Sequence, residues 1–339
     1  MKKIILFLFL ILSSILTQDS FAQNIEKIKD HAEKGDANAQ YVWGLRYFDG
    51  EGVAKDYQEA VKWFKKAAER GDDKAQFKLA LCYKYGDGVS VDTKEMVKWF
   101  GKAAERGMAN AQYLLGICYY DGDGISQNYN EALQWLVKAE KQGHAKAQAK
   151  LGMHYYQGIA TPKDINKAIG YFSKAAVQGN ADGENGLGFC YYNGEGVDLN
   201  FKEAVRWFKK AAAQGNANAE YKLGMCYSNG TGLKKNERKA VEWFTKAAIH
   251  GHEYAQFKLG VSYLNGTAVP KDYAEATKWL RIAAEKGNAY AQYNLGLCYY
   301  YGTGVRKSMK DTRELMKLSF ENGCKEAKVF WDKHELWKQ

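Results

Sequence analysis

The sequence predicts an all-α protein built from tandem helix–turn–helix units of 36 residues. Glycine returns at this interval, an aromatic residue returns at the same interval, and apolar residues between them have helical spacing. The glycines are Gly35, Gly71, Gly107, Gly143, Gly179, Gly215, Gly251, Gly287 and Gly323. The aromatic residues are Trp63, Trp99, Trp135, Tyr171, Trp207, Trp243 and Trp279. A constant period of this length is the signature of a repeat protein.

Each repeat contains two helical segments with one apolar face. In the third repeat, Ala111, Leu115 and Tyr119 are spaced four residues apart, which puts them on one face of a helix. In the second segment, Ala132 and Trp135 begin an apolar series with i, i+3, i+4, i+7 spacing. The recurring glycine after this segment stands where a helix commonly ends in a left-handed residue.

Single capping helices are predicted before and after the repeats. Eight repeats occupy residues 36–323. Residues 23–35 have the pattern of a lone second helix, and residues 324–339 have that of a lone first helix. One helix pair cannot bury its apolar face alone, so stacked pairs form the core and the terminal helices are modified to face water.

A glycine-containing connector joins the two helices of each repeat. The first is FDGEGVAKDY, residues 48–57, and it recurs as GDGVSVD, GDGISQN, GEGVDLN, GTGLKKN and GTGVRKS, with GIATPKD and GTAVPKD as variants. A dinucleotide loop would need a preceding strand and a third glycine, and a calcium loop would need a distal glutamate, so we interpret the connector as a turn. Its last position always holds an N-cap residue type: Asp56, Asp92, Asn128, Asp164, Asn200, Asn236, Asp272 or Ser308.

Residues 1–22 have the pattern of a signal peptide. Two lysines precede the apolar run IILFLFLILSSIL, and the small residues Ser20 and Ala22 precede a predicted cleavage point after Ala22. The run is shorter than the roughly 20 residues of a membrane span, although an uncleaved N-terminal anchor is the alternative. We therefore expect an exported chain, located in the periplasm, on the outer-membrane surface or outside the cell, with no stable membrane insertion after cleavage.

The repeat AxAQYxLGxxYxxGxGV…DxxxAVxWFxKAAxxG resembles the Sel1-like repeat, a variant of the tetratricopeptide architecture with a slightly longer unit. The resemblance covers essentially the whole chain after residue 22. It implies a right-handed superhelical solenoid that serves as a protein-binding scaffold or adaptor. Secreted bacterial members of that family include binders of host immune factors and the cysteine-rich proteins of a gastric pathogen.

The cysteines are predicted to be free and buried. Five of them occupy one position of the first helix: Cys82, Cys118, Cys190, Cys226 and Cys298. Equivalent atoms of stacked repeats lie about 10 Å apart, beyond the roughly 7 Å Cα separation that a disulfide tolerates. Arg46, His154 and Ser262 fill the position in other repeats, and Cys324 lies at the start of the last helix, where it could be exposed.

No motif for catalysis, metal binding or a cofactor was found. Some cysteine-rich relatives have been proposed to bind or hydrolyse β-lactams, but no serine after residue 22 has a lysine three residues later, and no HExxH motif is present.

The formal charge is +10, yet export argues against a nucleic-acid partner and favours an acidic protein or an anionic envelope surface. The lysines of the second helices are interpreted as a solvated basic face.

The first helices are expected to line a concave groove with aromatic residues. The candidate partner-binding residues are Tyr41, Phe77, Tyr113, Tyr120, Tyr156, Tyr192, Tyr221, Tyr254, Phe257, Tyr290, Tyr293 and Tyr300. Such rings bury a large area and, in tyrosine, keep a polar group. Packing between repeats is the alternative role for the same positions.

The predicted function is that of a monomeric, non-enzymatic scaffold that binds another protein in this groove. Two alternatives are a secreted virulence factor that binds a host protein and a weak hydrolase that binds β-lactams or cell-wall fragments.

Overall fold

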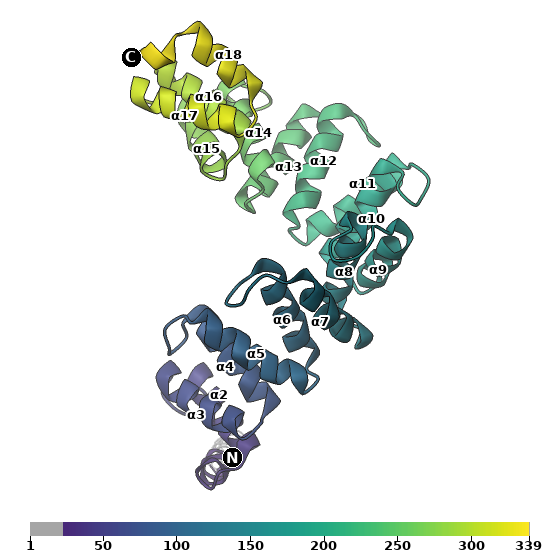
Figure 1. The fold of residues 1–339 in the computed structure, drawn as a ribbon, viewed down its shortest axis with the longest axis vertical. Coiled ribbons are helices and arrows are strands. Elements are labelled where there is room, and N and C mark those ends of the chain that lie inside the picture. The colour runs from purple at the N-terminus through teal and green to yellow at the C-terminus, as the bar shows by residue number, and fades with distance from the viewer. Residues whose placement is uncertain (1–22, 339) are drawn as a thin grey trace, which may run out of the picture. The chain divides into compact units, whose positions relative to one another are not determined.

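A computed structural model describes residues 23–338, which form α-helices and one short 3₁₀ helix without any strand (Figure 1). The predicted signal peptide, residues 1–22, lies outside this range. A helix through residues 23–33 precedes the repeats, and helix α18 (Lys325–Lys333) with the 3₁₀ helix Leu336–Lys338 follows them. The described part of the chain therefore confirms the all-α fold of tandem helix pairs.

Helices α2 to α17 each contain 13 residues, and consecutive helices form the eight pairs. Their bounds are Ala37–Asp49 (α2), Tyr57–Glu69 (α3), Asp73–Tyr85 (α4), Thr93–Glu105 (α5), Ala109–Asp121 (α6), Tyr129–Lys141 (α7), Ala145–Gln157 (α8), Ile165–Val177 (α9), Ala181–Asn193 (α10), Phe201–Ala213 (α11), Ala217–Asn229 (α12), Glu237–Ile249 (α13), Glu253–Asn265 (α14), Tyr273–Glu285 (α15), Ala289–Tyr301 (α16) and Met309–Glu321 (α17). We number the repeats 1 to 8 from the pair α2–α3 to the pair α16–α17.

The chain divides into two compact units within repeat 4. The first unit contains the described residues up to Ala147 together with Gly158–Pro162, and the second contains Gln148–Gln157 and the chain from Lys163 onward. Inside each unit, a second helix packs on the first helix of its own repeat and on that of the next, as α3 does on α2 and α4. Buried apolar residues form one large cluster from Ala60 to Cys118 in the first unit and several separate clusters in the second, one of them around Phe208.

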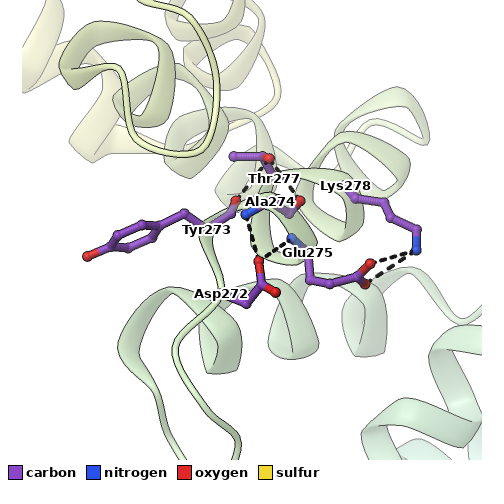
Figure 2. Close-up of polar contacts among 6 residues, drawn as sticks. All are labelled: Asp272, Tyr273, Ala274, Glu275, Thr277 and Lys278. Atoms are coloured by element: carbon purple, nitrogen blue, oxygen red, sulfur yellow. Dashed lines mark hydrogen bonds and ion pairs between the residues drawn. The ribbon is translucent and has the colours of Figure 1, made fainter.

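The eight predicted N-cap residues all cap the second helix of their repeat. In repeat 7, the Oδ1 atom of Asp272 accepts hydrogen bonds from the backbone N–H groups of Ala274 at 2.9 Å and Glu275 at 3.0 Å (Figure 2). Glu275 also pairs with Lys278 one turn later, at 3.0 Å. Donors that the first helical turn leaves unpaired are thereby satisfied, which fixes where α15 begins.

The connector is a turn, as predicted. Gly50 and Gly52 in its first copy have φ angles of 79° and 80°, a left-handed conformation that glycine adopts without steric cost. Two connectors have alanine at the position of the second glycine, and Ala160 and Ala268 keep positive φ angles of 56° and 60°. The backbone path is therefore preserved even where the residue type changes.

The two helices of a repeat approach each other closely at a small residue. A Cβ atom on Gly44 of α2 would lie 2.7 Å from the ring of Phe64 and 3.2 Å from the carbonyl oxygen of Ala60, both in α3. Phe64 is fully buried, as are its equivalents Phe100 and Phe208. The glycine of the first helix thus makes room for the largest core side chain of the second.

All six cysteines are free and buried. This confirms the prediction for the five cysteines that share one position of the first helix. Cys324 is also fully buried at the start of α18, so its expected exposure was wrong: it packs in the last apolar cluster with Met316 and Phe330. Burial raises the pKa of the Cys82 thiol to about 12 and that of Cys118 to about 11.

Among the described residues, no helix is both long and apolar enough to cross a membrane.

Candidate protein-binding surface

Ten of the twelve candidate aromatic residues are half-buried and contact a neighbouring ring. Tyr41 and Phe77 lie 5.9 and 5.7 Å from the buried rings of Phe64 and Phe100. The other half-buried candidates are Tyr113, Tyr120, Tyr156, Tyr192, Tyr221, Phe257, Tyr293 and Tyr300. These side chains pack between helices, which is the alternative role that the sequence analysis gave for them. Part of each residue nevertheless remains accessible to solvent.

Two candidates stack on the histidine that begins the next repeat. The ring of Tyr113 lies 4.7 Å from His144, and that of Tyr221 lies 4.3 Å from His252. Each histidine is an N-cap whose Nδ1 accepts a hydrogen bond from the third residue after it. Burial lowers the pKa of both histidines, that of His252 to about 4, so both rings are neutral at pH 7.

Tyr293 and Tyr300 pack against the closing helix α18. Their rings lie 6.5 and 5.1 Å from Phe330, and the Tyr300 hydroxyl is 3.1 Å from Nδ1 of His334. Packing, the alternative role for these positions, applies to both tyrosines, because helix α18 covers part of the face of α16 that carries them.

Tyr254 and Tyr290 are the two candidates that are exposed, to 53% and 49%. Tyr254 lies 6.3 Å from the half-buried Tyr221, and Tyr290 lies 6.1 Å from the half-buried Phe257. Each exposed ring therefore sits beside the ring of the preceding repeat. We call Tyr254 and Tyr290 the exposed tyrosine pair.

The structure also shows a polar side-chain contact between the two helices of a repeat that the sequence analysis missed. Gln112 in α6 donates from Nε2 to the backbone oxygen of Ala104 at 3.1 Å, and its Oε1 accepts from Gln142 at 2.8 Å. Equivalent contacts join Gln178 to Gln148, Gln214 to Glu184, His250 to Glu220, and Asn322 to Gln292. The sequence signal is a glutamine or glutamate directly after the position of Ala39 in every repeat, from Gln40 to Gln292.

The basic face of the second helices is partly used for packing. The Nζ atoms of Lys66, Lys138 and Lys210 lie 4.0, 3.6 and 4.3 Å from the ring centroids of the tryptophans three residues earlier. The ammonium group of each lysine covers the outer face of the ring and is attracted to the negative charge of its π system. These lysines are therefore less available to an anionic partner than a free lysine would be.

The described side chains form no metal-binding cluster, and their buried thiols are weakly acidic. No group of three or more His, Cys, Asp and Glu residues in the described part of the chain is arranged to hold a metal ion. The in-phase thiols have raised pKa values, which lowers their fraction of reactive thiolate.

The family model of the Sel1 repeat matches residues 37–72, 73–108, 109–144, 145–180, 181–216, 217–252, 253–288 and 289–324. The chain belongs to the Sel1 repeat family. These eight matches correspond to the eight helix pairs, and proteins built from Sel1 repeats generally serve as scaffolds for protein interactions.

Two solved structures of Sel1 repeat proteins resemble this one over most of its length. One is a protective antigen of uropathogenic Escherichia coli, with 34% identity and a TM-score of 0.65 over 91% of this chain and 67% of the other. The second is a Sel1 repeat protein of Oxalobacter formigenes, with 30% identity and a TM-score of 0.64 over 91% of this chain and 90% of the other.

A shorter sequence match is to the secretory immunoglobulin A-binding protein EsiB of Escherichia coli. It has 46% identity over 41 residues, which are 12% of this chain and 8% of that protein. The match is little longer than one Sel1 repeat, and the chain thus aligns with only a small part of EsiB.

Proposed function

We propose that this Sel1 repeat protein is a non-enzymatic scaffold that binds a partner protein through the aromatic surface of its first helices. The observation that supports this most is the exposed tyrosine pair, since two large rings in consecutive repeats are held half in solvent. Exposed aromatic residues beside other rings are typical of energetic centres in protein interfaces. The ten half-buried candidates would contribute the accessible parts of their rings around the pair.

Export is part of the same proposal. The lysines, apolar run and small residues of positions 1–22 support a cleaved signal peptide. The partner would then be met in the periplasm, at the outer-membrane surface or outside the cell, and the protein would act as a monomer. Mass spectrometry of the native N-terminus would test this, and a protein that keeps residues 1–22 would contradict it.

The binding site is tested with the double variant Tyr254→Ala, Tyr290→Ala. A partner is captured from envelope extract with the wild-type protein, identified by mass spectrometry and purified. We expect the double variant to bind it at least tenfold more weakly, equivalent to about 1.4 kcal/mol, because loss of a central aromatic residue typically costs more than this. Both side chains are exposed, so the thermal unfolding midpoint should change little.

The matched control is Lys202→Ala, Lys209→Ala on the exposed face of helix α11. These changes remove two charges without touching the groove, and affinity should stay within about twofold. If the lysine variant lost the partner and the tyrosine variant kept it, the basic outer face would be the binding surface.

A second candidate function is binding of a host immune protein. It is supported by the 46% identity to the secretory immunoglobulin A-binding protein over 41 residues. Surface plasmon resonance with purified secretory immunoglobulin A on the immobilised chain would test it. Saturable binding that the tyrosine double variant weakens would favour this candidate, and no response at micromolar antibody would eliminate it.

The absence of enzyme activity is itself a proposal and has a direct test. Purified protein should not turn over a chromogenic β-lactam faster than buffer does. Turnover that scales with protein concentration would support the hydrolase alternative instead.

A further inference from the structure

Repeats 4 and 5 lack a ring that the other repeats have. The position of Tyr41 holds an aromatic residue in six repeats: Tyr41, Phe77, Tyr113, Tyr221, Phe257 and Tyr293. In repeats 4 and 5 the equivalent residues are Ala149 and Asn185, and Asn185 is followed by Gly186. Two consecutive repeats therefore lack the ring at this position.

A cavity of about 310 Å³ lies beside Asn185 in the second unit. Among its lining residues are Tyr156, Phe172, Asn185, Phe189, Asn193 and Asn218, which come from helices α8, α9, α10 and α12. Phe172 is 1% exposed and forms part of the buried wall, with the ring of Tyr156 6.4 Å away. The residues that line the cavity include no charged side chain, although 26% of the chain is charged.

One polar atom at this cavity has no hydrogen-bond partner. Asn185 is 91% buried, and its Oδ1 is an unpaired acceptor. An unpaired buried acceptor typically costs about 1–3 kcal/mol, which a ligand that donates a hydrogen bond would recover. The terminal torsion of asparagine is soft, so the amide can turn this oxygen toward a ligand. The nearby Asn193 already donates to the Tyr156 hydroxyl, at 3.2 Å.

We propose that this cavity binds one neutral aromatic side chain of the partner protein that carries a donor at its edge, namely tryptophan or tyrosine. Phe172, Phe189 and Tyr156 offer ring surfaces on which an aromatic side chain packs favourably. The Asn185 acceptor matches an indole N–H or a phenol O–H. A carboxylate or ammonium group is excluded because burial without a countercharge is costly. The proposal rests on the partner being a protein.

Blocked tripeptides of the form acetyl-Gly-Xaa-Gly-amide test the specificity of the cavity. Their binding to the purified chain is measured by saturation-transfer NMR, with Trp, Tyr, Phe, Leu or Asp as Xaa. We expect the Trp and Tyr peptides to bind, the Phe peptide to bind about fivefold more weakly for want of one hydrogen bond, and the Asp peptide not to bind. Equal binding of the Phe and Trp peptides, preference for Asp, or no binding of any peptide would overturn the proposal.

Two variants locate the binding in the cavity. Asn185→Tyr restores the ring found in six other repeats and should fill the cavity, so binding of the Trp peptide should fall at least tenfold. Asn229→Tyr adds the same side chain at an exposed position of α12 and should leave binding unchanged. Equal binding by wild type and Asn185→Tyr would place the peptide elsewhere.

A third variant removes the acceptor without filling the space. Asn185→Leu keeps the number and branching of the side-chain heavy atoms, and it should reduce Trp-peptide binding to the level of the Phe peptide while leaving the Phe peptide unaffected. Unchanged discrimination between the two peptides would contradict the role of Asn185, even if Asn185→Tyr proved unstable.

Failure of this inference is distinguishable from failure of the proposed function. If Asn185→Tyr still binds the captured partner and the tyrosine double variant does not, the scaffold function stands and the cavity has no part in it. If both variants keep the partner at full affinity, the aromatic groove itself is not the binding surface.

Discussion

The connectors within repeats and the junctions between repeats both contain glycine with positive φ, but for different reasons. In the connector of repeat 2, a Cβ atom on Gly88 would lie 2.2 Å from the backbone oxygen of Tyr57 in the preceding repeat. At the junction before α6, Gly107 has a φ of 96°, and an added Cβ atom would meet nothing within 4 Å. In repeat 2 the connector glycine is thus required by a neighbouring backbone, and the junction glycine before α6 by its own conformation.

The largest effect is expected for Gly88→Ala. The added methyl group collides with main chain that cannot move without shifting helix α3, and the positive φ adds strain. We expect a loss of about 2–4 kcal/mol in the free energy of unfolding, measured by urea denaturation. A loss below 1 kcal/mol would show that connector and junction glycines serve the same purpose.

The junction before α14 should respond to pH through His252. Burial lowers its pKa from 6.5 to about 4 in the folded protein. The unfolded chain therefore binds a proton first as the pH falls, so the stabilisation is complete above pH 6.5 and is lost between pH 6.5 and 4. Because the ring is partly exposed, solvent screening reduces the loss to about 1–2 kcal/mol.

The control for that prediction is His252→Asn, since Asn216 and Asn288 cap the equivalent helices. Urea denaturation at pH 7 and at pH 4.5 should show a smaller pH dependence for the variant. His144 retains a similar environment, so some dependence should remain. An identical pH dependence in wild type and variant would remove His252 as the cause.

Gly107→Ala should cost less than Gly88→Ala. Only the left-handed conformation opposes the methyl group, and the expected loss is about 1 kcal/mol. Thermal or urea denaturation of the two variants in parallel gives the direct comparison. A loss as large as that of Gly88→Ala would mean that the junction is more crowded than its open surroundings indicate.

The smallest effect is expected for Ala268→Gly in the connector of repeat 7. The change relieves the strain of an alanine at a φ of 60°, which stabilises the folded state. It also raises the conformational entropy of the unfolded chain, which destabilises the folded state by a similar amount. We expect a change within about 0.5 kcal/mol, with stabilisation favoured. A loss above 1 kcal/mol would mean that the alanine methyl group makes a stabilising contact.

The sequence predicted the helix pairs and their ends because those features are local. Asp272 caps α15 through atoms two and three residues away, and the 36-residue period identified its seven equivalents. The burial of the cysteines also followed from their phase within the first helix. Cys324 was misjudged because it belongs to no complete repeat, and its cover is supplied by side chains of α17 and α18.

The candidate surface was harder to predict because helical phase gives a direction and not the distance to the next repeat. Phe257 and Tyr293 share one helical phase and are both half-buried, yet Phe257 packs beside Tyr290 of the next repeat while Tyr293 packs on Phe330 of α18. The cavity beside Phe172 lies where repeat 5 has Asn185 in place of an aromatic residue. The sequence shows that this ring is missing, but the space it leaves can be recognised only once the packing position of the ring is known.

The hydrogen bond that joins Gln112 to Gln142 has a consequence for how such a chain changes over evolution. Its counterparts use Gln with Glu, His with Glu, and Asn with Gln, so every observed pairing places a donor on the later helix and an acceptor on the earlier one. Both partners of each pair belong to one repeat, so duplication or deletion of a whole repeat in the gene moves the pair as a unit and does not separate donor from acceptor. The array can therefore lengthen or shorten by 36 residues without a compensating mutation in this pair.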